Sequence, residues 1–141
     1  MTADPFDLDR FVSAQDDVYD SALDELRRGR KQSHWMWFIF PQIAGLGHSA
    51  TAQFYAIASL DEAQAYLQHP VLGRRLIECA GVLAETSGRS AAQIFGSLDA
   101  QKLHSSITLF HRAAPDEPTF VDVLNRYFDG AFDSATDQRL R

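Results

Sequence analysis

Hydrophobic residues recur every three or four positions along most of the chain, which is the spacing of one face of an α-helix. Between residues 8 and 26 the apolar side chains form one such stripe, and the acidic side chains occupy the opposite face. This pattern predicts a single helix over about 5–28, with Asp4 as its N-cap and Gly29 at its end. Similar stripes and capping residues predict further helices at about 33–40, 49–58, 59–69, 70–87, 90–95, 99–113 and 118–128.

Strand patterns are missing from the sequence. No segment alternates apolar and polar residues as a half-buried strand does. The 141 residues correspond to one domain, and the hydrophobic share of 45% is ordinary for a chain that buries a core. We therefore predict an all-α fold, a single compact domain of about seven helices over residues 1–130, followed by a flexible C-terminal tail over 131–141.

The central run HWMWFIF, residues 34–40, is almost entirely large and apolar. Its periodicity does not separate a buried strand from a buried helical turn. Ser33 as an N-cap favours a helix, which Pro41 then ends because proline lacks the N–H that continues one.

The two tryptophans of this run are expected to have different environments. Residues two apart on a helix point about 200° apart, so at most one of Trp35 and Trp37 can lie at the centre of a shared face. On that helix Trp35 shares its side with Phe38, and Trp37 shares its side with Phe40. We expect one of these pairs in the core and the other at a less buried position, where it could line a ligand site.

Charge is distributed unevenly along the chain. The net charge is −6, and residues 1–25 hold eight acidic residues but only Arg10 as a base. Four cations follow within residues 27–31. The overall negative charge opposes a broad electrostatic grip on nucleic acid or on an anionic membrane, so neither is an expected partner. The acidic residues of the first helix have the spacing of a solvated face, and we assign them no chemistry.

The segment from Arg27 to Ser49 is the main candidate for a binding site. It combines the four cations, four of the sixteen aromatic residues and a Gly-Leu-Gly loop. Cations and the N–H groups at the start of the next helix could hold an anionic group, while a tryptophan stacks on a planar ring. The alternative is a central hydrophobic helix next to a solvated basic turn. The candidate ligand-binding residues are Arg30, Lys31, Ser33, His34, Trp35, Trp37, Gln42, Gly45, Gly47 and Ser49.

Other kinds of site find little support in the residue pattern. His34 is a candidate general base, although a hydrogen bond to the backbone is an equal possibility for it. The five histidines include no pair at helical i,i+3 or i,i+4 spacing, so we expect no metal site, and no motif indicates a cofactor. Cys79 lies on an apolar helical stripe and is expected to be a buried core residue.

The cellular location follows from the N-terminus and the hydropathy. The N-terminal segment is acidic and lacks the apolar stretch of a secretory signal. No run approaches the roughly 18 apolar residues of a membrane span. We therefore expect a cytoplasmic protein.

Two runs, GRKQSHWMWFIFPQIAGLGHSATAQFYAI and SLDEAQAYLQHPVLGRRL, closely resemble a bacterial family known as domain-of-unknown-function family 1810. The resemblance extends from Phe6 to about Phe128 and implies a small, mainly helical fold. Some members carry the name calpastatin, but nothing in this sequence resembles that repetitive, disordered inhibitor. The resemblance implies no particular reaction, cofactor or partner.

Two functional hypotheses follow from the residues. The first is a helical protein that binds an anionic small molecule, nucleotide-like or phosphorylated, in a pocket made by the candidate residues. The second is a protein-interaction module, or a self-associating scaffold without catalysis, which uses the acidic first helix and the basic turn after it. The sequence leaves open whether the protein is an enzyme and in which oligomeric state it exists.

Overall fold

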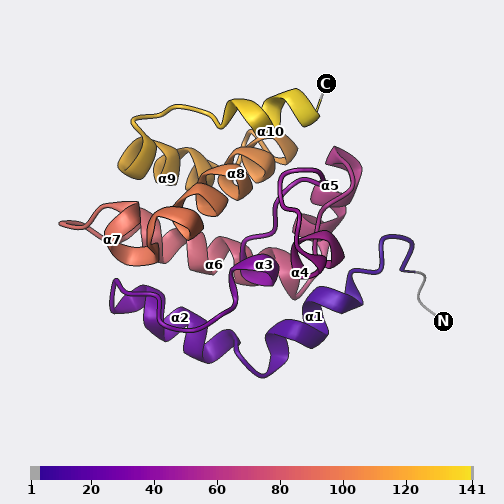
Figure 1. Ribbon diagram of the computed structural model, residues 1–141, viewed down its shortest axis with the longest axis horizontal. Coiled ribbons are helices and arrows are strands. Elements are labelled where there is room, and N and C mark those ends of the chain that lie inside the picture. Colours follow the sequence, from indigo (N-terminus) through magenta and orange to yellow (C-terminus); the bar gives the residue numbers. More distant parts are fainter. Residues whose placement is uncertain (1–3, 141) are drawn as a thin grey trace.

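The fold is entirely helical over residues 4–140, the part of the chain that the computed structural model describes (Figure 1). That part contains ten helices, of which six have seven or more residues, rather than the predicted seven or so. It contains no strand, and Ile43 and Ile57 form only an isolated parallel bridge. The helices are α1 (Asp9–Asp16), α2 (Tyr19–Arg27), α3 (Met36–Ile39), α4 (Ala50–Phe54), α5 (Leu60–Gln68), α6 (Leu72–Glu85), α7 (Ala91–Phe95), α8 (Ser97–Ala113), α9 (Pro118–Phe128) and α10 (Ser134–Arg139).

The two longest helices, α6 and α8, lie in the middle of the molecule, and the others pack around them (Figure 1). Helix α9 contacts both, α10 and α7 contact α8, and α5 joins α6 to α8. On the other side α2 packs on α6, and the short α3 lies between α1 and α8. Cys79 is buried in this core, as expected, and burial raises the pKa of its thiol to about 12. No helix in the described part is both long and apolar enough to cross a bilayer.

The single helix predicted over 5–28 is instead two helices, α1 and α2, which form a V at the lower edge of Figure 1. The chain bends at Val18, whose backbone leaves the helical region with φ −124°. The bend lets α1 pack on α3 while α2 packs on α6, and one straight helix would not reach both. Gln15, buried near the bend, donates a hydrogen bond of 2.7 Å to the carbonyl of Phe38 and so ties α1 to α3. Apolar spacing alone does not reveal this bend.

The C-terminal segment also differs from the sequence prediction, because residues 134–139 form α10 where we expected a flexible tail. The buried carboxylate of Asp133 caps this helix by accepting hydrogen bonds from the N–H and the hydroxyl of Thr136. The same carboxylate accepts hydrogen bonds from Ser105 and Gln101 on α8. Polar contacts therefore hold this segment in place, which explains why it lacks a hydrophobic stripe.

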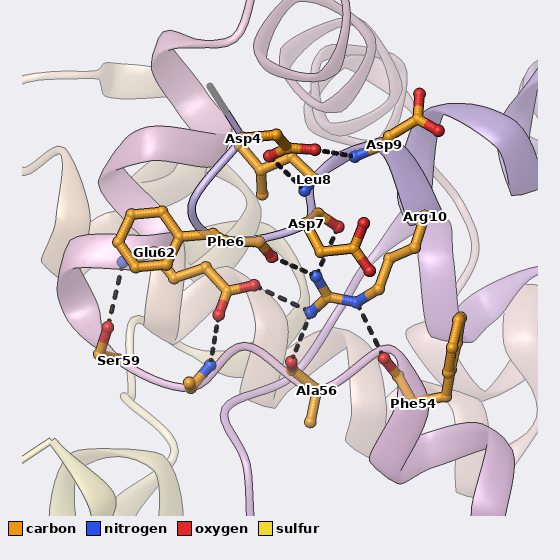
Figure 2. A network of polar contacts seen from close by, with 11 residues as sticks. Asp4, Phe6, Asp7, Leu8, Asp9, Arg10, Phe54, Ala56, Ser59 and Glu62 are labelled. Carbon is orange, nitrogen blue, oxygen red and sulfur yellow. Dashed lines mark hydrogen bonds and ion pairs between the residues drawn. The ribbon is translucent and has the colours of Figure 1, made fainter. Parts of the chain in front are cut away.

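Arg10 fastens α1 to the loop between α4 and α5 (Figure 2). All five guanidinium N–H groups have acceptors, at 2.6–2.9 Å. Four are backbone carbonyls and the fifth is the carboxylate of Glu62, which is itself buried and also accepts the N–H of Ala58. The acceptors are the carbonyls of Phe6, Asp7, Phe54 and Ala56 and Oε2 of Glu62. Because each donor is already used, Arg10 has a structural role, fixing the backbone that leads into α5.

Candidate functional site

The loop that carries the basic cluster is shaped by the buried carboxylate of Glu25 on α2. Its Oε1 accepts hydrogen bonds from the N–H groups of Gln32 and Ser33, at 2.7 and 2.9 Å, and from Nε1 of Trp35 at 3.0 Å. Its Oε2 accepts the hydroxyl of Ser33 at 2.6 Å. Only 6% of Glu25 is exposed. Glu25 thus fixes the backbone from Gln32 to Trp35 and orients the indole ring.

The environment of Glu25 shows that two of the sequence predictions are wrong. Its burial opposes ionisation, but the hydrogen bonds from Ser33, Gln32 and Trp35 outweigh burial and lower its pKa to about 2. Glu25 is therefore an exception to the solvated face to which we assigned all the acids of the first helix. Ser33 does not cap a helix over 33–40 either, because its side chain donates to Glu25, and α3 begins only at Met36.

The two tryptophans lie in different environments. Trp35 is fully buried, and its ring packs against Phe40 and Phe95, with centroids 6.3 and 6.4 Å away. Trp37 is only partly buried. The prediction that Trp35 and Phe38 lie on the same side of a helix is wrong. Trp35 precedes α3, and its backbone has φ −138° and ψ 3°. Of the two tryptophans, Trp37 is therefore the more exposed one.

Lys31 and Asp99 connect the basic loop to the first turn of α8. The Lys31 ammonium lies 3.0 Å from Oδ2 of Asp99 and 5.0 Å from the centre of the Trp35 ring. It also donates to the carbonyl of Ser33. Only 8% of the Lys31 side chain is exposed. The backbone N–H of Lys31 bonds to the carbonyl of Ile94, so both its main chain and its side chain are fixed.

Lys102 lies one turn further along α8 and is more accessible. Its ammonium is 3.3 Å from Oδ1 of Asp99 and 5.0 Å from the centre of the Trp37 ring, and 28% of the side chain is exposed. One carboxylate thus bridges two lysines, which gives the three side chains a net charge of about +1 at neutral pH. Leu98, which is 80% exposed, precedes Lys102 by four residues and so shares its helix face. We call Trp37, Leu98 and Lys102 the Trp37 patch.

Arg30 and His34 are exposed on the same loop as Lys31. The backbone N–H of Arg30 bonds to the carbonyl of Glu25, which fixes the main chain at that point. Within residues 4–140, no carboxylate lies in ion-pair distance of the Arg30 guanidinium, and no hydrogen bond engages the His34 ring. Both side chains are therefore available to a ligand.

The glycine loop between α3 and α4 is closely packed. A Cβ at Gly47 would lie 2.5 Å from the Cβ of Ala52 and 3.9 Å from Oε1 of Gln42, so only glycine fits there. Gly45 has φ +99°, and its carbonyl accepts a hydrogen bond of 3.4 Å from Arg139 on α10. At Gly45 and Gly47 other parts of the protein, Arg139 and Ala52, approach the backbone closely. This packing explains why the loop contains two glycines.

Ser49, which we listed as a ligand-binding residue, is the N-cap of α4, and its hydroxyl accepts the N–H of Ala52 at 3.1 Å. The side-chain amide of Gln53 donates a hydrogen bond to the carbonyl of His48. One of the N–H groups that we proposed for an anion is thus already bonded inside the loop.

The candidate residues fall into two groups in space. Those of residues 30–37 lie beside α2 and α8, whereas those of residues 42–49 lie beside α4 and α10. In the described part of the chain, no hydrogen bond or ion pair joins the two groups. Two surface depressions of about 390 and 490 Å³ lie elsewhere, the first beside Arg112 and Asp137 and the second beside Asp4 and His69.

Asp99 and Lys102 are the site residues that we did not identify from sequence. Their acid–base spacing of i,i+3 on the helix predicted over 99–113 is visible in the sequence, but Asp99 stands at the predicted start of that helix, where an acidic residue is typical of a cap. The actual N-cap of α8 is Gly96, so Asp99 lies within the first turn. Nothing in the sequence indicates that Lys102 meets Trp37, 65 residues earlier in the chain.

Comparison with known proteins gives a consistent family assignment. The chain is similar to the crystal structure of the conserved hypothetical protein Rv1873 from Mycobacterium tuberculosis, with 55% sequence identity and a TM-score of 0.96. The superposition covers 97% of this chain and 98% of that one. A search of curated proteins found no match. The family model described as "Protein of unknown function (DUF1810)" matches residues 5–140. The chain therefore belongs to the DUF1810 family.

Proposed function

We propose that this protein binds a small anionic molecule with a planar ring, nucleotide-like or phosphorylated, at the Trp37 patch. The observation that carries the proposal is the position of Lys102, whose ammonium lies over the Trp37 ring while part of its side chain remains exposed. Arg30 and His34 are the further groups that we assign to the ligand's anionic end.

The patch offers both kinds of contact that such a ligand needs. An ammonium has three N–H donors, and Asp99 accounts for one interaction of Lys102, so donors remain for an anionic group. The exposed part of Trp37 and the side chain of Leu98 provide apolar surface for the ring. Stacking of a base on an aromatic side chain contributes about 1–3 kcal/mol, and hydrogen bonds to charged groups contribute about as much.

The other candidate residues already have protein partners, so we assign them structural roles. Ser33 and Trp35 are held by Glu25, and Lys31 is enclosed by protein groups. We assign Gln42, Gly45, Gly47 and Ser49 to the packing of the adjoining loop. The single cysteine has no partner for an intrachain disulfide and suits a reducing compartment, so we also propose that binding takes place in the cytoplasm.

Thermal unfolding with adenosine monophosphate tests the proposal, because a ligand that binds only the folded state raises the melting temperature. We expect the wild type to show a rise that grows with ligand concentration. Lys102→Gln and Trp37→Leu should each lose most of it. Arg74→Gln is the matched control, since it removes an exposed cation of α6 that has no ion pair among the described residues.

Two results would contradict the proposal. One is a melting temperature that does not rise with adenosine monophosphate, with other phosphorylated aromatic compounds or with inorganic phosphate. The other is a rise that is the same in wild type, Lys102→Gln and Trp37→Leu, because binding would then take place elsewhere on the protein.

A further inference from the structure

We propose that one side of α8 is a docking surface for the C-terminal segment of a second copy of this chain, which there replaces the chain's own segment. We call residues 131–140 the C-terminal strap. This inference goes beyond the proposed function and is independent of it, because it uses none of the residues assigned to the ligand.

The side of α8 that carries the strap is polar along its length. Its residues recur at helical spacing, so they share one face, and each of them contacts the strap. They are Gln101, His104, Ser105, Thr108, His111 and Arg112. This face would be wet without the strap, and the strap covers it mainly through hydrogen bonds and ion pairs.

Asp133 holds the first half of the strap. Its carboxylate accepts hydrogen bonds from the hydroxyl of Ser105 at 3.0 Å and from the amide of Gln101 at 3.1 Å. Its backbone N–H donates to the hydroxyl of Thr108 at 2.9 Å. A row of hydroxyl and amide groups on α8 is thus matched to one carboxylate.

Arg112 holds the second half. Its Nε and Nη2 each donate to the carboxylate of Asp137 at 3.0 Å, and its guanidinium lies 4.0 Å from the centre of the Phe132 ring. The same ring stacks on His111, with centroids 5.5 Å apart. The α8 surface therefore fits an acidic segment with two carboxylates one helical turn apart and an aromatic ring before them.

Apolar burial contributes little to the hold on the strap. Within residues 131–140 only Asp133 and Thr136 are buried, and both are polar. The two residues that precede the strap, Asp129 and Gly130, both have left-handed backbone, with φ 55° and 75°, and so break the chain direction after α9. Because apolar burial is the main stabilising term in folding, the strap opens at a lower free energy than the core.

An opened strap can dock on the α8 surface of another molecule. When two copies exchange straps, the contacts made between molecules are the same as those made within one, so their energies cancel. The remaining factor is the effective concentration of the strap in its own chain, which is about millimolar for a short flexible connection. We therefore expect a reversible dimer with a Kd on the order of 1 mM.

A peptide with the sequence of residues 130–140, labelled for fluorescence anisotropy, tests the docking surface. The variant Asp133→Ala/Asp137→Ala keeps the α8 surface but weakens its own strap. We expect this variant to bind the peptide about tenfold or more tightly than the wild type does, because the wild-type strap competes. Adding Arg112→Gln to the variant should weaken peptide binding by about threefold or more.

The control variant removes the same number of charges elsewhere. Asp116→Ala/Asp122→Ala changes two exposed residues that make no ion pair in the described part of the chain, and it should bind the peptide as the wild type does. Circular dichroism checks that each variant is folded.

Two measurements on the wild type complete the test and need no variant. Sedimentation at about 1 mM protein should show a large share of dimer that disappears on dilution. In hydrogen exchange, the N–H groups of Thr136 and Leu140, which are bonded within the strap, should exchange about a hundredfold or more faster than those of Leu109 and Phe110 in α8.

Three results would overturn the proposal. One is a wild type that stays monomeric at about 1 mM. Another is equal protection of the strap and of α8 in hydrogen exchange. The third is a peptide that binds the folded Asp133→Ala/Asp137→Ala variant no better than it binds the wild type.

Discussion

Glu25→Gln tests whether the buried carboxylate holds the basic loop in place. The substitution keeps the size of the side chain and an oxygen that can accept from Gln32, Ser33 and Trp35, but it removes the charge. The amide also presents N–H donors where Oε2 now accepts the Ser33 hydroxyl. We therefore expect a folded but less stable protein.

The size of the loss follows from the pKa of Glu25. The fall from 4.5 to about 2 on folding corresponds to about 3 kcal/mol at pH 7, at about 1.4 kcal/mol per pH unit. The number of hydrogen bonds gives a similar value, because each of the four loses roughly 1 kcal/mol when its acceptor becomes neutral. Because the folded-state pKa is the lower one, this stabilisation is complete above about pH 4.5 and disappears as the pH falls towards 2.

Urea unfolding of wild type and Glu25→Gln at pH 7 and pH 3 measures this loss. We expect the difference in unfolding free energy to be about 3 kcal/mol at pH 7 and about 2 kcal/mol smaller at pH 3. Glu85→Gln is the control, because Glu85 is exposed at the end of α6. A difference below about 1 kcal/mol at pH 7, or one that is equal at both pH values, would refute this role of Glu25.

Two further pairs of variants test the packing around the site. Trp35→Ala should cost about 3–5 kcal/mol in urea unfolding because it empties a fully buried position, whereas Trp37→Ala should cost clearly less; equal large losses would mean that both rings are structural. Gly47→Ala should destabilise the protein by about 1–3 kcal/mol because its Cβ would meet Ala52, while Gly81→Ala, with open space around it in α6, should be neutral or stabilising by up to about 1 kcal/mol. A neutral Gly47→Ala in thermal unfolding would contradict the close packing of the loop.

Local signals in the sequence predicted much of the helical framework. Ser49, Ser59 and Ser90 each cap the helix expected to follow, and Pro118 begins α9. Capping depends on hydrogen bonds between residues two or three apart, so the residues themselves reveal it. The all-α class follows in the same way from periodicity.

The errors arise where polar contacts between distant segments decide the structure. Helix α10 depends on the buried carboxylate of Asp133 and its partners on α8, which are some 30 residues away in the chain. Glu25 lies beside the apolar stripe of α2, but its partners belong to the loop after that helix. Periodicity detects apolar faces and does not detect a carboxylate that is buried with its donors.

The candidate site could be predicted only in part. The sequence singled out the loop with Arg30, Lys31 and His34 and predicted different environments for the two tryptophans. The lysine pair depends on α8 lying against that loop, and contacts between such distant segments have no local signal. Asp99 and Lys102 therefore became visible only in the folded chain.

The most direct test of ligand binding at the Trp37 patch is a nuclear magnetic resonance titration of the two indole N–H signals with phenyl phosphate. The Trp37 ring lies next to the Lys102 ammonium and the residue is only partly buried, whereas Trp35 is buried and donates its indole N–H to Glu25. We predict that the Trp37 signal moves with ligand concentration and saturates, while the Trp35 signal stays almost unchanged. A titration that leaves the Trp37 signal in place, or that shifts only signals around the depression beside His69, would contradict a ligand site at this patch.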